Sequence, residues 1–381
     1  MGYVAVSGGS EAIANAEELL TFYRLKGGAS PIEVRQIREQ MRLAVDKVMS
    51  EGALYAPTIA AIALKQAEGD NIEASFILRA YRATQPRRYY SLPADTGKMR
   101  VIRRISAAFQ DVPGGQILGP TRDYTQRLVD FSLLEESPET VRAFFDRIGV
   151  QTSRSDQLPD SFPKIIDLLR REGLLVEPVD RKETLFDITR ESISFPCQRS
   201  AKLQSLARGE TGVMMALAYS SMRGFGDIHP YLGELRVGTV PLCINHPAKE
   251  QPVYIGRVLV TEAEIISEYY EDEQGKPKLT LGYGLCFGHN ELKAIAMGVL
   301  DRTMQSRSPH KSPAEDEEFV LYHIDGIESS GFSAHWKLPH YVTFQSTLDR
   351  LRRTQQLREE ATASECNREQ RRDPGKTAPG L

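Results

Sequence analysis

The sequence predicts an α+β protein in which a mainly helical N-terminal part is followed by a mixed α/β part with a small sheet. In the N-terminal part, apolar residues recur every three or four positions, as on one buried helix face: Val34, Ile37, Met41, Val45 and Val48. In the second half, three segments have the branched apolar content of strands: residues 235–244, 253–260 and 279–287.

Capping residues and glycines set the expected helix boundaries. Asp70, with Glu73 three residues later, predicts a helix start. Ser137-Pro138 predicts another start, and Gly149 the end of that helix. In the second half we expect helices over residues 200–208, from Thr261, over 291–304 and over 315–330.

These patterns predict five successive parts. Residues 1–150 form a mainly helical domain, and residues 151–192 form a linker or variable connection. Residues 193–345 form an α+β domain that carries the nucleotide and metal sites. A C-terminal helix is expected over residues 346–361, and a disordered tail over residues 362–381, whose composition is polar.

Composition excludes several classes of protein. The 381 residues include 48 Lys and Arg against 51 Asp and Glu, a net charge of −3, so a globally basic nucleic-acid binder is not expected. No apolar run approaches the ~20 residues of a membrane span, and the N-terminus lacks the pattern of a secretion signal. Four scattered cysteines predict reduced thiols in a cytoplasmic protein.

Two histidines five residues apart, His335 and His340, suggest half of a metal site. Pro339 disfavours a continuous helix here, so an extended or turning segment is expected to bring the two imidazoles together. Zinc takes three or four ligands, and imidazole is its common partner. The alternative is that both are ordinary polar residues of a loop or an interface.

Three glycine-rich segments are candidate anion sites. Residues 112–121, before a helix expected at Thr121, either present N–H groups to an anion or simply turn the chain. Gly282, Gly284 and Gly288 lie between a strand and a helix, a layout that binds phosphates. Their spacing matches neither the dinucleotide fingerprint nor a P-loop. Residues 220–234 carry mixed charges among glycines, as sites on loops do.

Taken together, several strings resemble one family, the I subunit (PhnI) of the carbon–phosphorus lyase core complex. The resemblance runs from Tyr3 to about Arg352, with a poor match over residues 135–192. The strings are Val112-Pro-Gly-Gly-Gln-Ile-Leu-Gly-Pro-Thr121, Pro196-Cys-Gln-Arg-Ser200, Ala218-Tyr-Ser220, Arg223-Gly-Phe-Gly226, Gly282-Tyr-Gly-Leu-Cys-Phe-Gly288, Asp316-Glu-Glu-Phe-Val-Leu321 and Lys337-Leu-Pro-His-Tyr-Val342.

The resemblance implies a nucleosidase component of phosphonate catabolism. With its companions PhnG, PhnH and PhnL, such a subunit displaces adenine from ATP by an alkylphosphonate and gives ribose 1-phosphonate 5-triphosphate. It also implies a central homodimer that packs against the radical enzyme PhnJ. The paired metal-binding histidines of the family fall on His335 and His340, and zinc is the expected ion.

Cleavage of a ribosyl C–N bond needs a carboxylate near the sugar, an acid for the base and cations for phosphates. By residue type, Arg199, Lys202 and Arg223 are candidates for the phosphates. Asp227 or Glu234 would hold the ribose, and His229 would be the acid. Two alternatives stay open: a non-catalytic scaffold subunit with a metal site at an inter-subunit interface, and a self-contained zinc hydrolase.

Overall fold

The computed structural model describes residues 9–28, 30–151, 162–176, 185–223, 229–249, 251–271, 275–306 and 312–372. The chain divides into two compact units. The larger unit is Ser30–Ser329, and the other consists of Met1–Ala29 with Ser330–Leu381. Residues 3–6, a short apolar run that favours a strand, lie outside the described residues.

The larger unit begins with the helical part that the sequence predicts. Its helices pack around one apolar cluster that includes Val45, Val48, Leu64 and Leu78. Asp70 accepts hydrogen bonds from the N–H groups of Ile72 and Glu73, as its predicted N-cap role requires. The helices are α2 (Val34–Gln40), α3 (Arg42–Glu51), α4 (Pro57–Gln66) and α5 (Asn71–Thr84).

A four-stranded antiparallel sheet with the strand order β1-β2-β3-β4 forms the centre of the larger unit. All three predicted strands are present, and β1 pairs with the first of them. The α+β class predicted from the sequence is confirmed. The strands are β1 (Arg100–Ile105), β2 (Tyr231–Asn245), β3 (Pro252–Glu271) and β4 (Pro277–Phe287).

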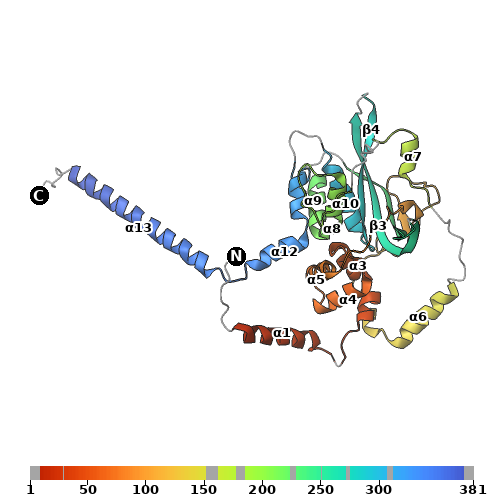
Figure 1. Ribbon diagram of the computed structural model, residues 1–381, viewed down its shortest axis with the longest axis horizontal. Helices are drawn as coiled ribbons and strands as arrows, with labels where there is room; N and C mark the ends of the chain where they lie inside the picture. Colours follow the sequence, from red (N-terminus) through yellow and green to blue (C-terminus); the bar gives the residue numbers. More distant parts are fainter. Residues whose placement is uncertain are drawn as a thin grey trace. The chain divides into compact units, whose positions relative to one another are not determined.

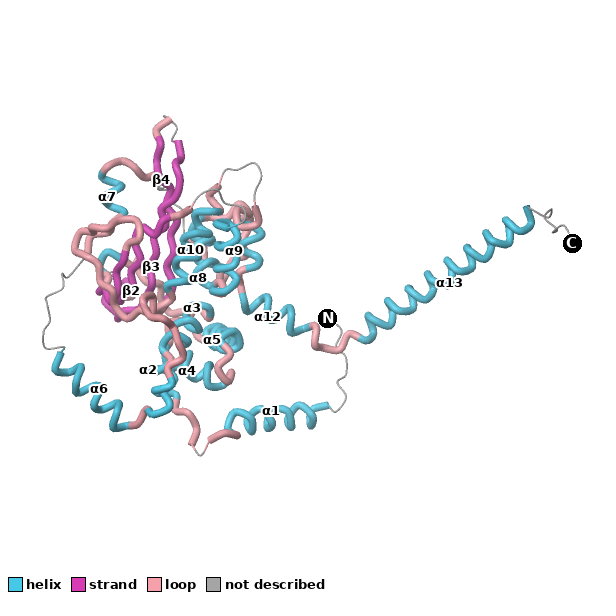
Figure 2. Tube along the Cα trace, turned by 180° about the vertical axis from the view of Figure 1, so that it is seen from behind, coloured by secondary structure: helices cyan, strands magenta, loops and turns pink. Residues whose placement is uncertain are grey.

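Helices cover one face of this sheet. Figure 1 and Figure 2 show α8, α9 and α10 on one side and α7 on the other. The apolar core between the sheet and α10 includes Leu235, Ala263, Ile265 and Met297. The helices of this part are α7 (Ile166–Arg171), α8 (Arg199–Arg208), α9 (Thr211–Arg223), α10 (Glu291–Thr303) and α11 (Glu317–His323).

The remaining elements are connections and helices of the smaller unit. Helix α12 crosses the boundary between the units. The helix predicted over residues 346–361 begins earlier and continues to Arg372. These elements are η1 (Thr96–Lys98), η2 (Phe131–Glu135), α6 (Pro138–Gln151), α1 (Gly9–Leu25), α12 (Gly326–His335) and α13 (Tyr341–Arg372).

Three local predictions are wrong. Residues 261–264 are not the start of a helix but the middle of β3, because they pair with strands on both sides. The expected helix at Thr121 is absent, and this stretch is a loop. His335 is the last residue of α12 rather than part of an extended segment, since the chain leaves the helix only in the turn before Pro339.

Candidate active site

The sheet face that points away from α10 carries a buried layer of charged side chains. Side chains alternate between the two faces of a strand, so Glu262 and Glu264 of β3 share this face. Cross-strand pairing aligns them with Arg236 and Tyr283 respectively, on the flanking strands. We call this set the charged face: Arg104, Glu234, Arg236, Glu262, Glu264 and Tyr283, all but the last fully buried.

Glu262 is the best-paired member of the charged face. Its Oε1 accepts hydrogen bonds from Thr96 Oγ1 (2.7 Å), Lys164 Nζ (2.8 Å) and Tyr283 Oη (2.8 Å). Its Oε2 accepts from the guanidinium of Arg236. Burial alone would raise the pKa of this carboxyl, but the charges of Arg236 and Lys164 outweigh it and lower the pKa to about 2. Glu262 is therefore an ionised anchor.

Glu264 has a different environment although it lies only two residues away. Its Oε1 accepts one hydrogen bond, from Lys164 Nζ (3.0 Å), and its buried Oε2 has no hydrogen-bond partner in the described parts of the chain. Burial raises the pKa of Glu264 to about 7; Lys164 opposes this shift, and the negative charges of Glu262 and Glu234 add to it. Two neighbouring carboxyls thus differ in protonation near neutral pH, a pattern typical of acid–base sites.

Arg104 connects the charged face to the loops that cover it. Its Nε donates to Glu234 Oε1 at 2.6 Å, and its other nitrogens donate to the carbonyls of Pro113, Gly115 and Pro163. The glycine-rich loop at residues 112–121 therefore points carbonyl oxygens at a guanidinium. This contact holds the loop against the sheet, and it fits the alternative in which the loop turns the chain.

An open pocket of about 750 Å³ borders the charged face. Its lining combines the residues around Thr96 with Phe162, Lys164 and residues of α7. Lys164 belongs to both the pocket and the charged face, because its ammonium bonds to Glu262 and Glu264 while the side chain stays 19% exposed. A ligand bound in the pocket would contact this ammonium group.

Of the predicted catalytic residues, Glu234 lies on the charged face. Its two carboxylate oxygens accept hydrogen bonds from Arg104 and from the N–H of Ile165 (3.1 Å). Arg223 ends α9, and His229 precedes β2; both are exposed. Asp227 lies outside the described residues. The ring of His229 is 5.8 Å from that of Tyr231, the first residue of β2.

Arg199 and Lys202 lie on the opposite, helical side of the sheet. Arg199 makes two hydrogen bonds to the buried carboxylate of Asp301 in α10, at 2.7 and 3.0 Å. Lys202 makes an ion pair of 2.7 Å with Glu317. Both cations already have carboxylate partners, so a phosphate bound there would share the cation with one of these carboxylates.

The glycines of the 282–288 segment allow close packing. A Cβ on Gly282 or Gly284 would lie 2.0 Å from a carbonyl oxygen of α10, so glycine lets the helix contact β4. Gly288 has φ +74° and faces Asp46. The Asp46 carboxylate accepts the N–H of His289 at 3.0 Å. An anion is therefore already bound at this turn, and it is the chain's own side chain.

The two histidines of the smaller unit lie side by side. The ring centroids of His335 and His340 are 5.2 Å apart. Each Nδ1 is 2.6 Å from a backbone carbonyl, of Phe332 and Leu338 respectively. A carbonyl only accepts, so each Nδ1 carries the proton, and each Nε2 of a neutral ring offers a lone pair. Within the described residues, no third His, Cys, Asp or Glu joins them.

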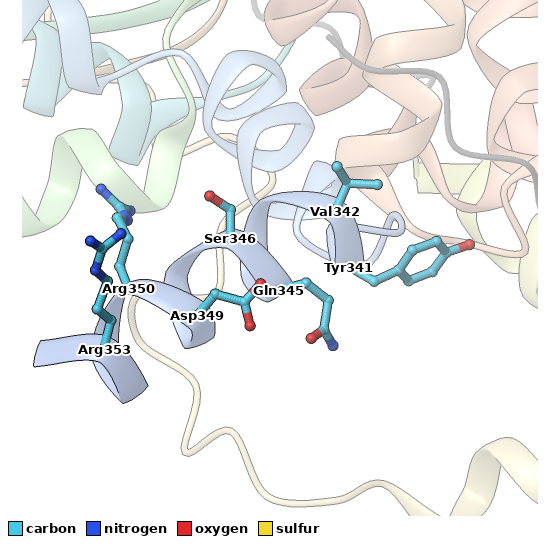
Figure 3. Close-up of a pocket in the computed structure, with 7 residues that line it drawn as sticks. All are labelled: Tyr341, Val342, Gln345, Ser346, Asp349, Arg350 and Arg353. Atoms are coloured by element: carbon cyan, nitrogen blue, oxygen red, sulfur yellow. The ribbon is translucent and has the colours of Figure 1, made fainter. Parts of the chain in front are cut away.

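A hollow on α13 has a different character. Figure 3 shows that its lining comes from this helix alone, with Tyr341 and Val342 at one end and Arg350 and Arg353 at the other. One helix provides no opposing wall, so the hollow does not enclose a ligand.

None of the helices that the structure describes combines the length and apolarity that a bilayer crossing requires.

Sequence reasoning missed Lys164, Thr96 and Tyr283. Lys164 falls within residues 151–192, which the sequence suggested were a linker, and nothing local marks it. In β3, Glu262 and Glu264 alternate with Ala263 and Ile265, as on a strand, but so short a pattern does not separate a strand from the first turn of a helix.

Comparison with known proteins identifies the family. The family model described as "Bacterial phosphonate metabolism protein (PhnI)" matches residues 2–358. A putative C-P lyase subunit protein, HtxH of Stutzerimonas stutzeri, is 52% identical over 360 residues, 93% of this chain and 96% of its own. The alpha-D-ribose 1-methylphosphonate 5-triphosphate synthase subunits PhnI of Rhizobium meliloti and Escherichia coli are 44% and 45% identical, covering 95% and 93% of this chain and 97% and 98% of their own. The chain belongs to the PhnI family of bacterial phosphonate metabolism proteins.

Proposed function

We propose that this chain is the nucleosidase component of a carbon–phosphorus lyase complex. With partner subunits it displaces adenine from ATP by an alkylphosphonate and gives ribose 1-phosphonate 5-triphosphate. Support comes from the family match over residues 2–358 and from the two synthase subunits, which are similar over nearly their whole length. The single structural observation that carries the proposal is the charged face with its pocket.

The chemistry of the proposed reaction matches that arrangement. Loss of a base from ribose develops positive charge at C1′, which nearby carboxylates stabilise. The departing base needs a proton, and a carboxyl that titrates near neutral pH supplies one efficiently. Glu262 has the ionised state that the first task requires, and the raised pKa of Glu264 makes this carboxyl a source of the proton for the second.

The roles inferred from the sequence are part of this proposal. Arg223, Asp227 and His229 belong to the segment that leads into β2, and Glu234 lies further along the same strand. In our proposal Arg223 contacts phosphate, Asp227 or Glu234 contacts the ribose, and His229 is a competing candidate for the acid. The other predicted phosphate contacts lie on the helical side of the sheet and mark the alternative position for the nucleotide: Arg199, Lys202, Gly282, Gly284 and Gly288.

We also propose that His335 and His340 contribute two ligands to a zinc site. The fit rests on their adjacent rings and on the two Nδ1–H···O=C hydrogen bonds, which orient metal-ligating histidines in general. A bound zinc ion would polarise phosphate oxygens as a Lewis acid. Further ligands would be phosphate oxygens, water or side chains of another subunit.

The proposed setting is a cytoplasmic assembly that contains a homodimer of this chain with PhnG, PhnH, PhnJ and PhnL. The smaller unit supports an assembly, because it exposes large apolar side chains that a partner would cover. These include Phe332, Trp336, Leu338, Val342 and Phe344, each more than half exposed. The same residues favour the second candidate function, a non-catalytic scaffold subunit.

Release of adenine tests the proposal directly. The complex is assembled with and without this chain and given ATP and methylphosphonate. Chromatography follows free adenine, and phosphorus NMR follows the ribose 1-phosphonate. We expect both products only when the chain is present. A complex that forms both products at the same rate without this chain would contradict the proposal.

A further inference from the structure

Lys164 is the point where the charged face meets the pocket. Its ammonium has three N–H groups, and two of them donate to carboxylates, to Glu262 Oε1 at 2.8 Å and to Glu264 Oε1 at 3.0 Å. The side chain lines the pocket and is 19% exposed. The remaining N–H can therefore donate to a ligand while two buried carboxylates hold the nitrogen in place.

Glu264 does not line the pocket, but it contacts the residue that does. Its second oxygen, Oε2, is buried and has no hydrogen-bond partner among the residues that the structure describes. An unpaired carboxylate oxygen in this position is costly, whereas a protonated oxygen carries less charge to solvate. A proton on Oε2 thus lies on the carboxyl group whose other oxygen accepts a hydrogen bond from a nitrogen that reaches the pocket.

The groups that surround Glu264 favour a transferable proton. They come from every element packed against it: Lys164 from the segment before α7, Glu234 and Arg236 from β2, Glu262 from β3 and Tyr283 from β4. Burial would lower the pKa of Lys164, but Glu262 and Glu264 outweigh it and raise that pKa, which keeps the amine charged at rest. Below about pH 7 the pair therefore consists of a charged ammonium group and a protonated carboxyl group.

We infer that Lys164 is the catalytic residue that protonates the departing base, and that Glu264 is the positioning residue that restores its proton. This inference rests on the proposed nucleosidase function. As the C1′–N9 bond breaks, its electron pair stays with adenine, and N7 of adenine takes a proton from Lys164 Nζ. The Glu264 carboxyl group then turns its protonated oxygen to the neutral amine, passes the proton to it and regains one from water. A phosphonate oxygen forms the new bond to C1′.

The first test measures kcat and KM for adenine release by the assembled complex. Lys164→Gln is expected to lower kcat by roughly 10²-fold or more, the usual contribution of a general acid. Lys164→Arg keeps the positive charge but cannot give up a proton near neutral pH, so it should lose a similar factor. The matched control is Lys98→Gln, which removes an exposed ammonium next to the lining residues and should leave kcat unchanged.

The second test uses a nucleotide whose base is already cationic. Methylation of purine N7 removes the need for protonation, so 7-methyl-ATP should restore most of the activity lost in Lys164→Gln. Glu264→Gln cannot restore the proton of Lys164, so it should lower kcat below pH 7. Because Gln does not ionise, the variant should also lack the fall in rate above about pH 7 that the wild type shows as Glu264 ionises. His229→Gln removes the competing candidate for the acid, and it is measured with the same two nucleotides.

The results distinguish a failure of the proposed nucleosidase function from a failure of the role inferred for Lys164. If the wild-type complex releases no adenine, the proposed function fails. If it does, and Lys164→Gln raises only KM while Lys164→Arg restores it, Lys164 binds an anion and our inference is overturned. Loss of kcat in His229→Gln with rescue by 7-methyl-ATP would assign the acid to His229. Native mass spectrometry checks the assembly of the complex for every variant. If Lys164→Gln does not assemble, Lys164→Met takes its place.

Discussion

Replacing Glu264 by Gln tests the electrostatics of the charged face without any assay of function. The pKa of this carboxyl is raised from 4.5 to about 7 by its buried position. A tenfold change in proton affinity corresponds to about 1.4 kcal/mol, so the ionised carboxylate costs about 3 kcal/mol in the folded protein. Gln has a similar shape and still accepts a hydrogen bond from Lys164, but it never ionises.

The direction with pH follows from proton binding. Between pH 4.5 and 7 the folded chain keeps a proton that the unfolded chain releases, so the free energy of unfolding falls as the pH rises. Glu264→Gln has no carboxyl group to ionise at this position, so its free energy of unfolding does not fall for this reason. Relative to the wild type, the variant should gain about 2 kcal/mol of stability between pH 5 and pH 8.

Urea unfolding of the full chain at several pH values measures this difference. Glu318→Gln is the matched control, because Glu318 is exposed and its replacement should give a difference that does not change with pH. The reasoning is refuted if the difference in free energy of unfolding between Glu264→Gln and the wild type is constant from pH 5 to pH 8. It is also refuted if the variant loses stability relative to the wild type as the pH rises.

Two further predictions address packing and metal binding. Gly284→Ala places a methyl group 2.0 Å from the Ala294 carbonyl oxygen, so it should destabilise the chain by several kcal/mol. Gly149→Ala, in open space on a helix, should change stability by about 1 kcal/mol or less, and equal thermal shifts would contradict the packing argument. His340→Ala should lower bound zinc, measured by mass spectrometry of the assembled complex. His323→Ala should not, although His323 also bonds a backbone carbonyl; unchanged zinc in both would remove the histidine pair from the site.

The elements of the fold were largely predictable because their signals are local. Apolar periodicity gave the helices around Val45 and Val48, and branched apolar runs gave the three long strands. The exception in β3 has a physical reason. Thr261-Glu-Ala-Glu264 has the composition of a helix first turn, and only pairing with β2 and β4 on both sides reveals a strand.

The candidate site was harder to predict because its residues meet only in the folded chain. Glu234 was singled out as a loop carboxylate, yet its partner Arg104 is 130 positions away. Lys164 and Tyr283 carry no motif of their own. The glycines near residue 284 had a recognisable layout, but that layout serves equally for close helix packing, and spacing cannot separate it from phosphate binding.

A structure of the assembled complex with a non-reactive ATP analogue and methylphosphonate tests the central claim most directly. The claim is that the nucleotide reacts at the charged face. We predict that the purine lies in the pocket with its N7 within hydrogen-bond distance of Lys164 Nζ. A purine bound instead on the helical side of the sheet, beside Arg199 and Asp301, would contradict it.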